Sequence, residues 1–190
     1  MKTHPIKSPE DLTRVHKALK KKFQNKKLIF GDGHLGADIV FVSEMPGPDE
    51  QKEAKPLAGL SAKLFNQLLR SAGINKNKVY VTNVVKYFPD GKMPTPKEIK
   101  SHSFFLKEEL KTIGPKVVVT LGNIALNGVG MRQPLDNVHG RSFNLGSYEL
   151  LPTYHPGSAL KDAQIKNILE TDFKKLKDLL AKPKEIEETY

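Results

Sequence analysis

Residues 37–42 (ADIVFV) run directly into residues 43–47 (SEMPG). The first six residues combine β-branched and aromatic side chains with little polar alternation, which is typical of a strand buried on both faces of a parallel sheet. The proline and glycine that follow end the strand and begin a loop. This loop places the carboxylate of Glu44 just beyond the carboxyl end of the strand.

Three more apolar segments have the same character, at residues 79–85, 116–121 and 148–153. Helical spacing of apolar side chains predicts helices at about residues 12–23, 60–72, 95–112, 124–128 and 162–180. Strands that alternate with helices favour a parallel sheet covered on both faces. We therefore predict an α/β fold of three layers, α/β/α, with a central four-stranded parallel sheet. We expect one domain over residues 1–190, with a charged tail from about residue 181.

Two local patterns refine this prediction. Thr95 and Glu98 have the spacing of a capping box, so a helix is expected to begin there. Residues 31–36 (GDGHLG) are rich in glycine, but no strand precedes them and no long helix follows directly, so we expect a loop and not a phosphate cradle. Residues 129–147 are expected to be irregular because they are rich in glycine, asparagine and proline.

Composition narrows the function classes. The chain has 31 Lys and Arg against 21 Asp and Glu, a net charge of +10, which favours a nucleic-acid partner first and an acidic membrane surface second. It contains no cysteine, which excludes disulfides, thiolate metal sites and cysteine nucleophiles. No apolar run approaches the roughly 20 residues that span a bilayer, and the N-terminus lacks the apolar core of a signal peptide. We expect a cytoplasmic protein, associated with the nucleoid if the source is prokaryotic.

Ligands of open α/β sheets bind beyond the carboxyl ends of the strands. Three polar side chains follow predicted strands there: the carboxylate of Glu44, the amide of Asn83 and the imidazole of His155. Each alone has an ordinary structural explanation, as an ion pair, a turn cap or a satisfied loop histidine. Their convergence on one edge predicts a site.

Five motifs in order resemble those of the uracil-DNA glycosylase superfamily, closest to its family 4 type. They are Ser43-Glu44-Met45-Pro46-Gly47, Pro56-Leu57-Ala58-Gly59, Tyr80-Val81-Thr82-Asn83-Val84-Val85-Lys86, the segment 115–122 (PKVVVTLG) and Pro152-Thr153-Tyr154-His155-Pro156. The similarity covers about residues 28–180. Each motif is weak by itself, but five in the same order are specific.

The resemblance implies roles for these residues. Glu44 is the candidate that stabilises the sugar cation and orients water, and His155 the candidate that stabilises the departing base at its O2 atom. Met45, Leu57 and Asn83 are expected to bind the base, with the Asn83 amide matching uracil O4 and N3–H. Base flipping must precede these steps.

The same resemblance implies DNA contacts. Leu160 is the candidate for the apolar wedge that enters the minor groove, with helix packing as the alternative. Gly157 and Ser158 suit a close approach to phosphate. The basic residues Lys86, Arg141 and Lys161 are expected to contact the DNA backbone, which would make binding sensitive to salt.

The sequence departs from family 4 in three places. The cysteines of its iron–sulfur cluster are missing, and Tyr87, His102 and His16 stand at or near their positions, so we expect no metal and no cofactor, with the N-terminal helix packed there directly. Leu57 replaces an aromatic residue that stacks on the base, and such stacking contributes about 1–3 kcal/mol. Ser43 replaces a glycine.

The sequence therefore predicts a monofunctional uracil-DNA glycosylase of base excision repair that acts on single- or double-stranded DNA as a monomer. Residues 88–94, where one relative carries a histidine that traps DNA covalently, are short and contain no histidine, so hydrolysis is expected. The alternatives are a non-catalytic DNA-binding relative and a glycosylase for another deaminated base such as hypoxanthine.

Overall fold

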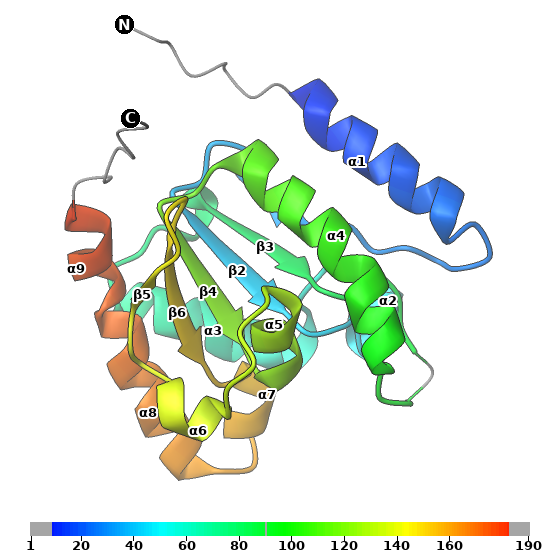
Figure 1. Cartoon of the computed structure of the whole chain (residues 1–190). Helices are drawn as coiled ribbons and strands as arrows, with labels where there is room; N and C mark the ends of the chain where they lie inside the picture. Colours follow the sequence, from blue (N-terminus) through cyan, green and yellow to red (C-terminus); the bar gives the residue numbers. More distant parts are fainter. Residues whose placement is uncertain (1–8, 90, 183–190) are drawn as a thin grey trace, which may run out of the picture.

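The protein, described over residues 9–89 and 91–182 in a computed structural model, is built around one sheet (Figure 1). The sheet has six strands in the order β1-β3-β2-β4-β6-β5. Its four central strands are parallel: β2 (Ile39–Ser43), β3 (Val79–Asn83), β4 (Val117–Leu121) and β6 (Glu149–Thr153). The predicted α/β class and its parallel core are confirmed.

Two short edge strands correct the predicted strand count. β1 (Asp32–Gly33) pairs antiparallel with β3, and β5 (Phe143–Asn144) pairs antiparallel with β6. The sequence predicted a loop and an irregular segment at these places. Two residues are too few to show a periodic pattern, so only their neighbours reveal them as strands.

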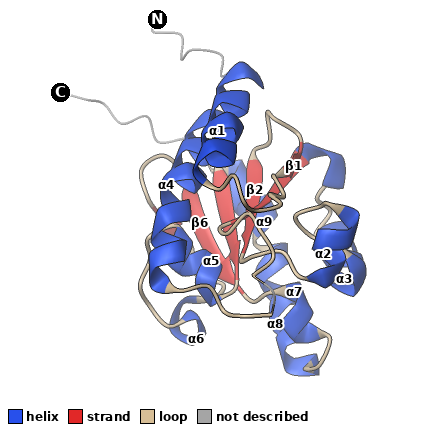
Figure 2. Cartoon of the chain, turned by 90° about the vertical axis from the view of Figure 1, so that its right-hand side faces the viewer, coloured by secondary structure: helices blue, strands red, loops and turns tan. Residues whose placement is uncertain are grey.

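Helices cover both faces of the sheet, as the edge-on view of Figure 2 shows. On one face lie α4 (Pro96–Ile113), α5 (Asn123–Gly128) and α6 (Leu135–Val138), with α1 (Pro9–Lys22) packed on α4. On the other lie α3 (Gly59–Ser71), α8 (Ala163–Lys174) and α9 (Leu176–Ala181). The connections contain α2 (Pro48–Glu53), the 3₁₀ helix η1 (Lys76–Lys78) and α7 (Pro156–Ala159). Among the described helices, none has the length and apolar character needed to cross a membrane.

The sheet separates two apolar cores because neighbouring side chains of a strand point to opposite faces. In β2, Val40 and Val42 join the core beneath α4 and α5, whereas Ile39 and Phe41 join the core beneath α3 and α8. All five residues of β2 are buried. Burial on both faces of the sheet explains why residues 39–42 form an uninterrupted apolar run in the sequence.

The helix boundaries agree with the capping signals at α4 but not at the C-terminal helix. Thr95 accepts a hydrogen bond from the Glu98 amide at 3.2 Å, and the Glu98 carboxylate accepts one from the Thr95 amide at 2.8 Å. The single helix predicted over residues 162–180 is wrong, because α8 and α9 are separate helices that meet at Lys175. The Lys175 ammonium donates to the carbonyl of Gly140 at 2.7 Å, a tertiary contact at the break. Most of the predicted charged tail lies outside the described residues.

Candidate active site

A pocket of about 330 Å³ lies beyond the carboxyl ends of the parallel strands. Strand register creates it, because Ser43 pairs with Asn83 and Leu121 pairs with Thr153, so that the loops after β2, β3 and β6 leave the sheet at one edge. Its lining residues are Ser43, Glu44, Met45, Gly47, Pro48, Asp49, Glu50, Pro56, Ala58, Ser61 and His155. The structure thus brings Glu44 and His155, which are far apart in the sequence, to one pocket.

Glu44 lies one residue beyond β2, opposite the start of α5. Its Oε1 atom accepts a hydrogen bond from the Ile124 amide at 3.0 Å. Burial raises the pKa of the Glu44 carboxyl above its ordinary value, and the Ile124 hydrogen bond opposes that rise. Gly122 leaves room for this carboxylate, because a Cβ atom there would lie 2.3 Å from Oε1. The protein therefore keeps a desolvated carboxylate in a fixed position.

His155 caps α7, and this contact fixes the chemical form of its ring. The Gly157 amide donates to Nδ1 at 2.9 Å, so the neutral imidazole carries its proton on Nε2. Burial lowers the pKa of His155 to about 4, which keeps the ring neutral near pH 7. A neutral imidazole with Nε2–H is a hydrogen-bond donor that does not add a full positive charge to the pocket.

Asn83 is fully buried at the end of β3. Its Nδ2 donates to the carbonyl oxygen of Pro56 at 2.9 Å, and its Oδ1 has no hydrogen-bond partner among the described residues. Asn83 is not itself among the residues that line the pocket, but Pro56 is. One proton of the Asn83 amide thus binds the Pro56 carbonyl, while Oδ1 can still accept a hydrogen bond and the second amide proton can still donate one.

The two apolar residues expected at the base differ in position. Met45 lines the pocket and also packs against the core beneath α4. Leu57 is partly buried and packs against the core on the other face, although its neighbours Pro56 and Ala58 line the pocket.

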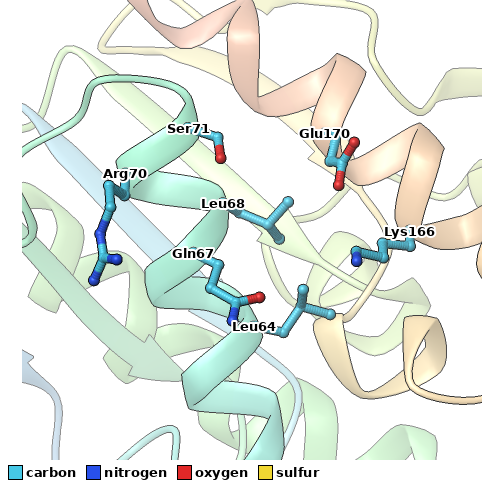
Figure 3. Close-up of a pocket in the computed structure, with 7 residues that line it drawn as sticks. All are labelled: Leu64, Gln67, Leu68, Arg70, Ser71, Lys166 and Glu170. Atoms are coloured by element: carbon cyan, nitrogen blue, oxygen red, sulfur yellow. The ribbon is translucent and has the colours of Figure 1, made fainter.

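A second hollow, of about 260 Å³, lies between α3 and α8 (Figure 3). Leu64, Gln67, Leu68, Arg70, Ser71, Lys166 and Glu170 line it. Figure 3 shows the Arg70 side chain extending away from Lys166 and Glu170, so these charged groups do not converge on one point. None of the residues predicted to act in the site lies here, which leaves the pocket at the strand ends as the candidate active site.

The chain matches a known protein family over most of its length. The Uracil DNA glycosylase superfamily model matches residues 30–177, which include all three loops of the pocket. The chain belongs to the uracil-DNA glycosylase superfamily. It is 35% identical over 165 residues to the type-4 uracil-DNA glycosylase of Sulfurisphaera tokodaii, covering 81% of this chain and 75% of that protein. It is also 35% identical over 161 residues to the type-4 enzyme of Thermotoga maritima, covering 82% and 84%.

Within this superfamily the chain lacks the residues for a type-4 iron–sulfur cluster. No cysteine is present in the sequence, and the described residues contain no group of three His, Cys, Asp or Glu side chains that could hold a metal. Phe23 stacks on His102 with ring centroids 4.1 Å apart, and the Tyr87 hydroxyl donates to Glu98 at 2.6 Å. α1 itself packs on α4, and Phe23, which directly follows α1, stacks on His102 of α4, as expected for a directly packed N-terminal helix.

The structure corrects the prediction that Lys86 contacts DNA. Lys86 is fully buried, and its ammonium forms an ion pair with Glu109 of α4 at 2.6 Å and a hydrogen bond to the Thr82 hydroxyl. Tyr80 also donates to Glu109, at 2.9 Å. A lysine in this position cannot reach a phosphate. The sequence signal that was missed is Glu109 itself, a charged residue on the inward stripe of α4.

The loop after β6 leaves its predicted DNA-contacting residues accessible. Ser158 and Leu160 are exposed, with 47% of the Leu160 surface accessible, and Gly157 is half-buried. The sequence analysis assigned no role to four other residues of the site: Glu50, Ser61, Gly122 and Ile124. Two of them had a usable signal: Gly122 ends the motif 115–122, and Glu50 stands three residues after Gly47, at the spacing of a capping box.

Proposed function

We propose that this protein is a monofunctional DNA glycosylase that hydrolyses the N-glycosidic bond of uracil in DNA and leaves an abasic site for base excision repair. The observation that carries the proposal is the pairing of a fixed, desolvated Glu44 carboxylate with a neutral His155 in one pocket. The curated relatives of similar length are named type-4 uracil-DNA glycosylases, which supports the same substrate.

The chemistry follows the charges that develop as the bond breaks. The sugar gains positive charge and the base gains negative charge. Glu44 stabilises the sugar cation and orients the attacking water, while the Nε2–H of His155 donates to uracil O2 as that oxygen becomes negative. The free Oδ1 of Asn83 accepts from uracil N3–H, and its second amide proton faces O4. Met45 packs against the flipped base.

The substrate is reached by flipping the nucleotide out of the stack. The exposed Leu160 fills the space that the base leaves, and Gly157 and Ser158 approach the phosphates. The net charge of +10 favours binding of the DNA backbone and makes it salt-dependent. We propose that the protein acts as a monomer on single- or double-stranded DNA.

The proposal is tested with oligonucleotides that carry uracil in single strands, opposite guanine and opposite adenine, followed by alkaline cleavage. The wild type is expected to give strand scission at uracil. Glu44→Gln and Asn83→Ala are each expected to lower kcat/KM by about 10²–10³-fold, the range for loss of one preorganised electrostatic group. Glu53→Gln is the matched control, because it makes the same chemical change at an exposed carboxylate of α2. Binding of DNA without scission would instead identify a non-catalytic relative.

The wedge is tested separately. Leu160→Ala is expected to reduce activity on double-stranded DNA about tenfold more than on single strands, because only a duplex must be held open after flipping. Leu35→Ala is the control, since Leu35 is a leucine of similar exposure, 41% against 47%, outside the pocket. Equal losses on both substrates would assign Leu160 a packing role.

The base specificity is tested at Leu57. Leu57→Phe is expected to lower KM for uracil-containing DNA, because an aromatic ring that stacks on the base adds about 1–3 kcal/mol. Unchanged kinetics would show that position 57 does not stack on the base. Scission at hypoxanthine in the same assay would widen the range of lesions.

A further inference from the structure

Two carboxylates that the mechanism above does not use line the pocket, Asp49 and Glu50. Glu50 lies in α2 and lines the pocket beside Gly47 and Ala58. Its two oxygens are both engaged. Oε2 accepts from the Gly47 amide at 2.9 Å, and Oε1 accepts from the Ala58 amide at 2.8 Å.

These two hydrogen bonds join separate segments of the site. Gly47 closes the loop that carries Glu44, and Ala58 belongs to the wall segment Pro56–Ala58 and caps α3. The other end of the same wall is fixed by Asn83, whose amide donates to the Pro56 carbonyl at 2.9 Å. Position 57 is therefore flanked on one side by a bond to Asn83 and on the other by a bond to Glu50.

The backbone directly after Ala58 also lies close to α2. Gly59, directly after the wall, has φ +60°, and a Cβ atom there would lie 2.1 Å from Oδ2 of Asp49. The adjacent carboxylates of Asp49 and Glu50 thus both contact the backbone at Ala58 and Gly59. The hydrogen bonds from the Gly47 and Ala58 amides to the Glu50 carboxylate are charge-assisted and short, which makes them stronger than bonds between neutral groups.

We propose that Glu50 is a positioning residue that sets the distance between the Glu44 loop and the base-binding wall, and so determines how tightly the pocket holds the flipped base. This inference rests on the proposed glycosylase function. A carboxylate is required because it accepts at two oxygens, whereas glutamine accepts at one oxygen and would turn the NH₂ donor of its carboxamide toward one of the two donating backbone amides.

The test is Glu50→Gln in the full chain, measured by steady-state kinetics on a single-stranded uracil oligonucleotide. We expect KM to rise about tenfold or more while kcat falls less than threefold, because a charge-assisted hydrogen bond is lost from groups that bind the base in the ground and transition states alike. Glu53→Gln is the matched control on the same helix. Removal of a negative charge by itself favours DNA binding, so we expect Glu53→Gln to leave KM unchanged or to lower it.

A second measurement does not depend on activity. Hydrogen exchange of the Gly47 and Ala58 amides, followed by NMR, is expected to accelerate in Glu50→Gln and to stay unchanged in Glu53→Gln. Unchanged protection of both amides, or faster exchange with an unchanged KM, would overturn the positioning role. A wild type that cleaves no uracil substrate, with both amides still released by Glu50→Gln, would overturn the proposed function and leave Glu50 as a structural clamp only.

Discussion

Substitution of Gly122 by alanine is expected to displace the Glu44 carboxylate and lower kcat/KM by about two orders of magnitude. The new Cβ atom would lie 2.3 Å from Oε1 and 2.7 Å from the carboxyl carbon of Glu44. Ordinary van der Waals contact begins near 3.4 Å, so the carboxylate must move by roughly 1 Å from the position in which the Ile124 amide binds it at 3.0 Å. A shift of that size in a catalytic group costs on the order of 10²-fold in rate.

The backbone also contributes to this effect, and a second glycine separates the two causes. Gly122 has φ +103°, a strained angle for alanine that costs on the order of 1–3 kcal/mol of stability. Gly130 has φ +101°, but a Cβ atom there would meet no atom within 4 Å, so Gly130→Ala carries the strain without the collision.

The assay compares kcat/KM on uracil-containing DNA for both variants, with the free energy of unfolding from urea titration as the second readout. Gly122→Ala should lose at least as much stability as Gly130→Ala, because it adds the collision to the backbone strain, and only Gly122→Ala should lose activity. If Gly122→Ala retained activity within threefold of Gly130→Ala, the fixed position of Glu44 would not matter for the reaction.

Three further predictions concern pH and the buried charges. The acid limb of kcat/KM should lie above the ordinary glutamate range and disappear in Glu44→Gln, because burial raises the pKa of the Glu44 carboxylate that must be ionised, whereas His155, with a pKa of about 4, stays neutral until lower pH. Burial likewise lowers the pKa of His102 to about 4, below its unfolded value of about 6.5. The unfolded chain therefore binds more protons between these pH values, and stability should fall as the pH drops from 6.5 to 4. Thermal unfolding of His102→Phe should show a smaller fall in stability over this range, and an equal fall would contradict the assignment to His102. Lys86→Met should reduce the free energy of unfolding by about 3–5 kcal/mol, because Glu109 stays buried without its cation. It should leave the salt dependence of DNA binding unchanged, and a weaker dependence of affinity on salt would show that Lys86 contacts a phosphate.

The parallel core of the fold could be predicted because burial on both faces leaves a direct trace in the sequence. The run 39–42 is apolar without alternation, and the capping box at Thr95 and Glu98 marks the beginning of α4. The edge strands β1 and β5 and the break between α8 and α9 leave no such trace. The edge strands form by pairing with strands distant in the sequence, and the break between the two helices lies where Lys175 binds the Gly140 carbonyl.

The candidate site was predictable to the level of its residue types. Glu44, Asn83 and His155 follow strands whose carboxyl ends must share an edge, and their motifs identify the superfamily. Lys86 shows where such reasoning fails. It continues the strand motif and looks accessible in the sequence, but its partner Glu109 is distant along the chain and lies on a buried helix stripe.

The sequence by itself determined the fold class, the superfamily and the candidate site residues, because buried periodicity and ordered motifs are local properties of the chain. The tertiary structure alone decided the chemical state of those side chains. The raised pKa of Glu44, the Nε2–H form of neutral His155 and the clamp at Glu50 each arise from desolvation or from a specific backbone amide. Desolvation depends on all the atoms that surround a group in the folded protein, and no stretch of sequence contains that information.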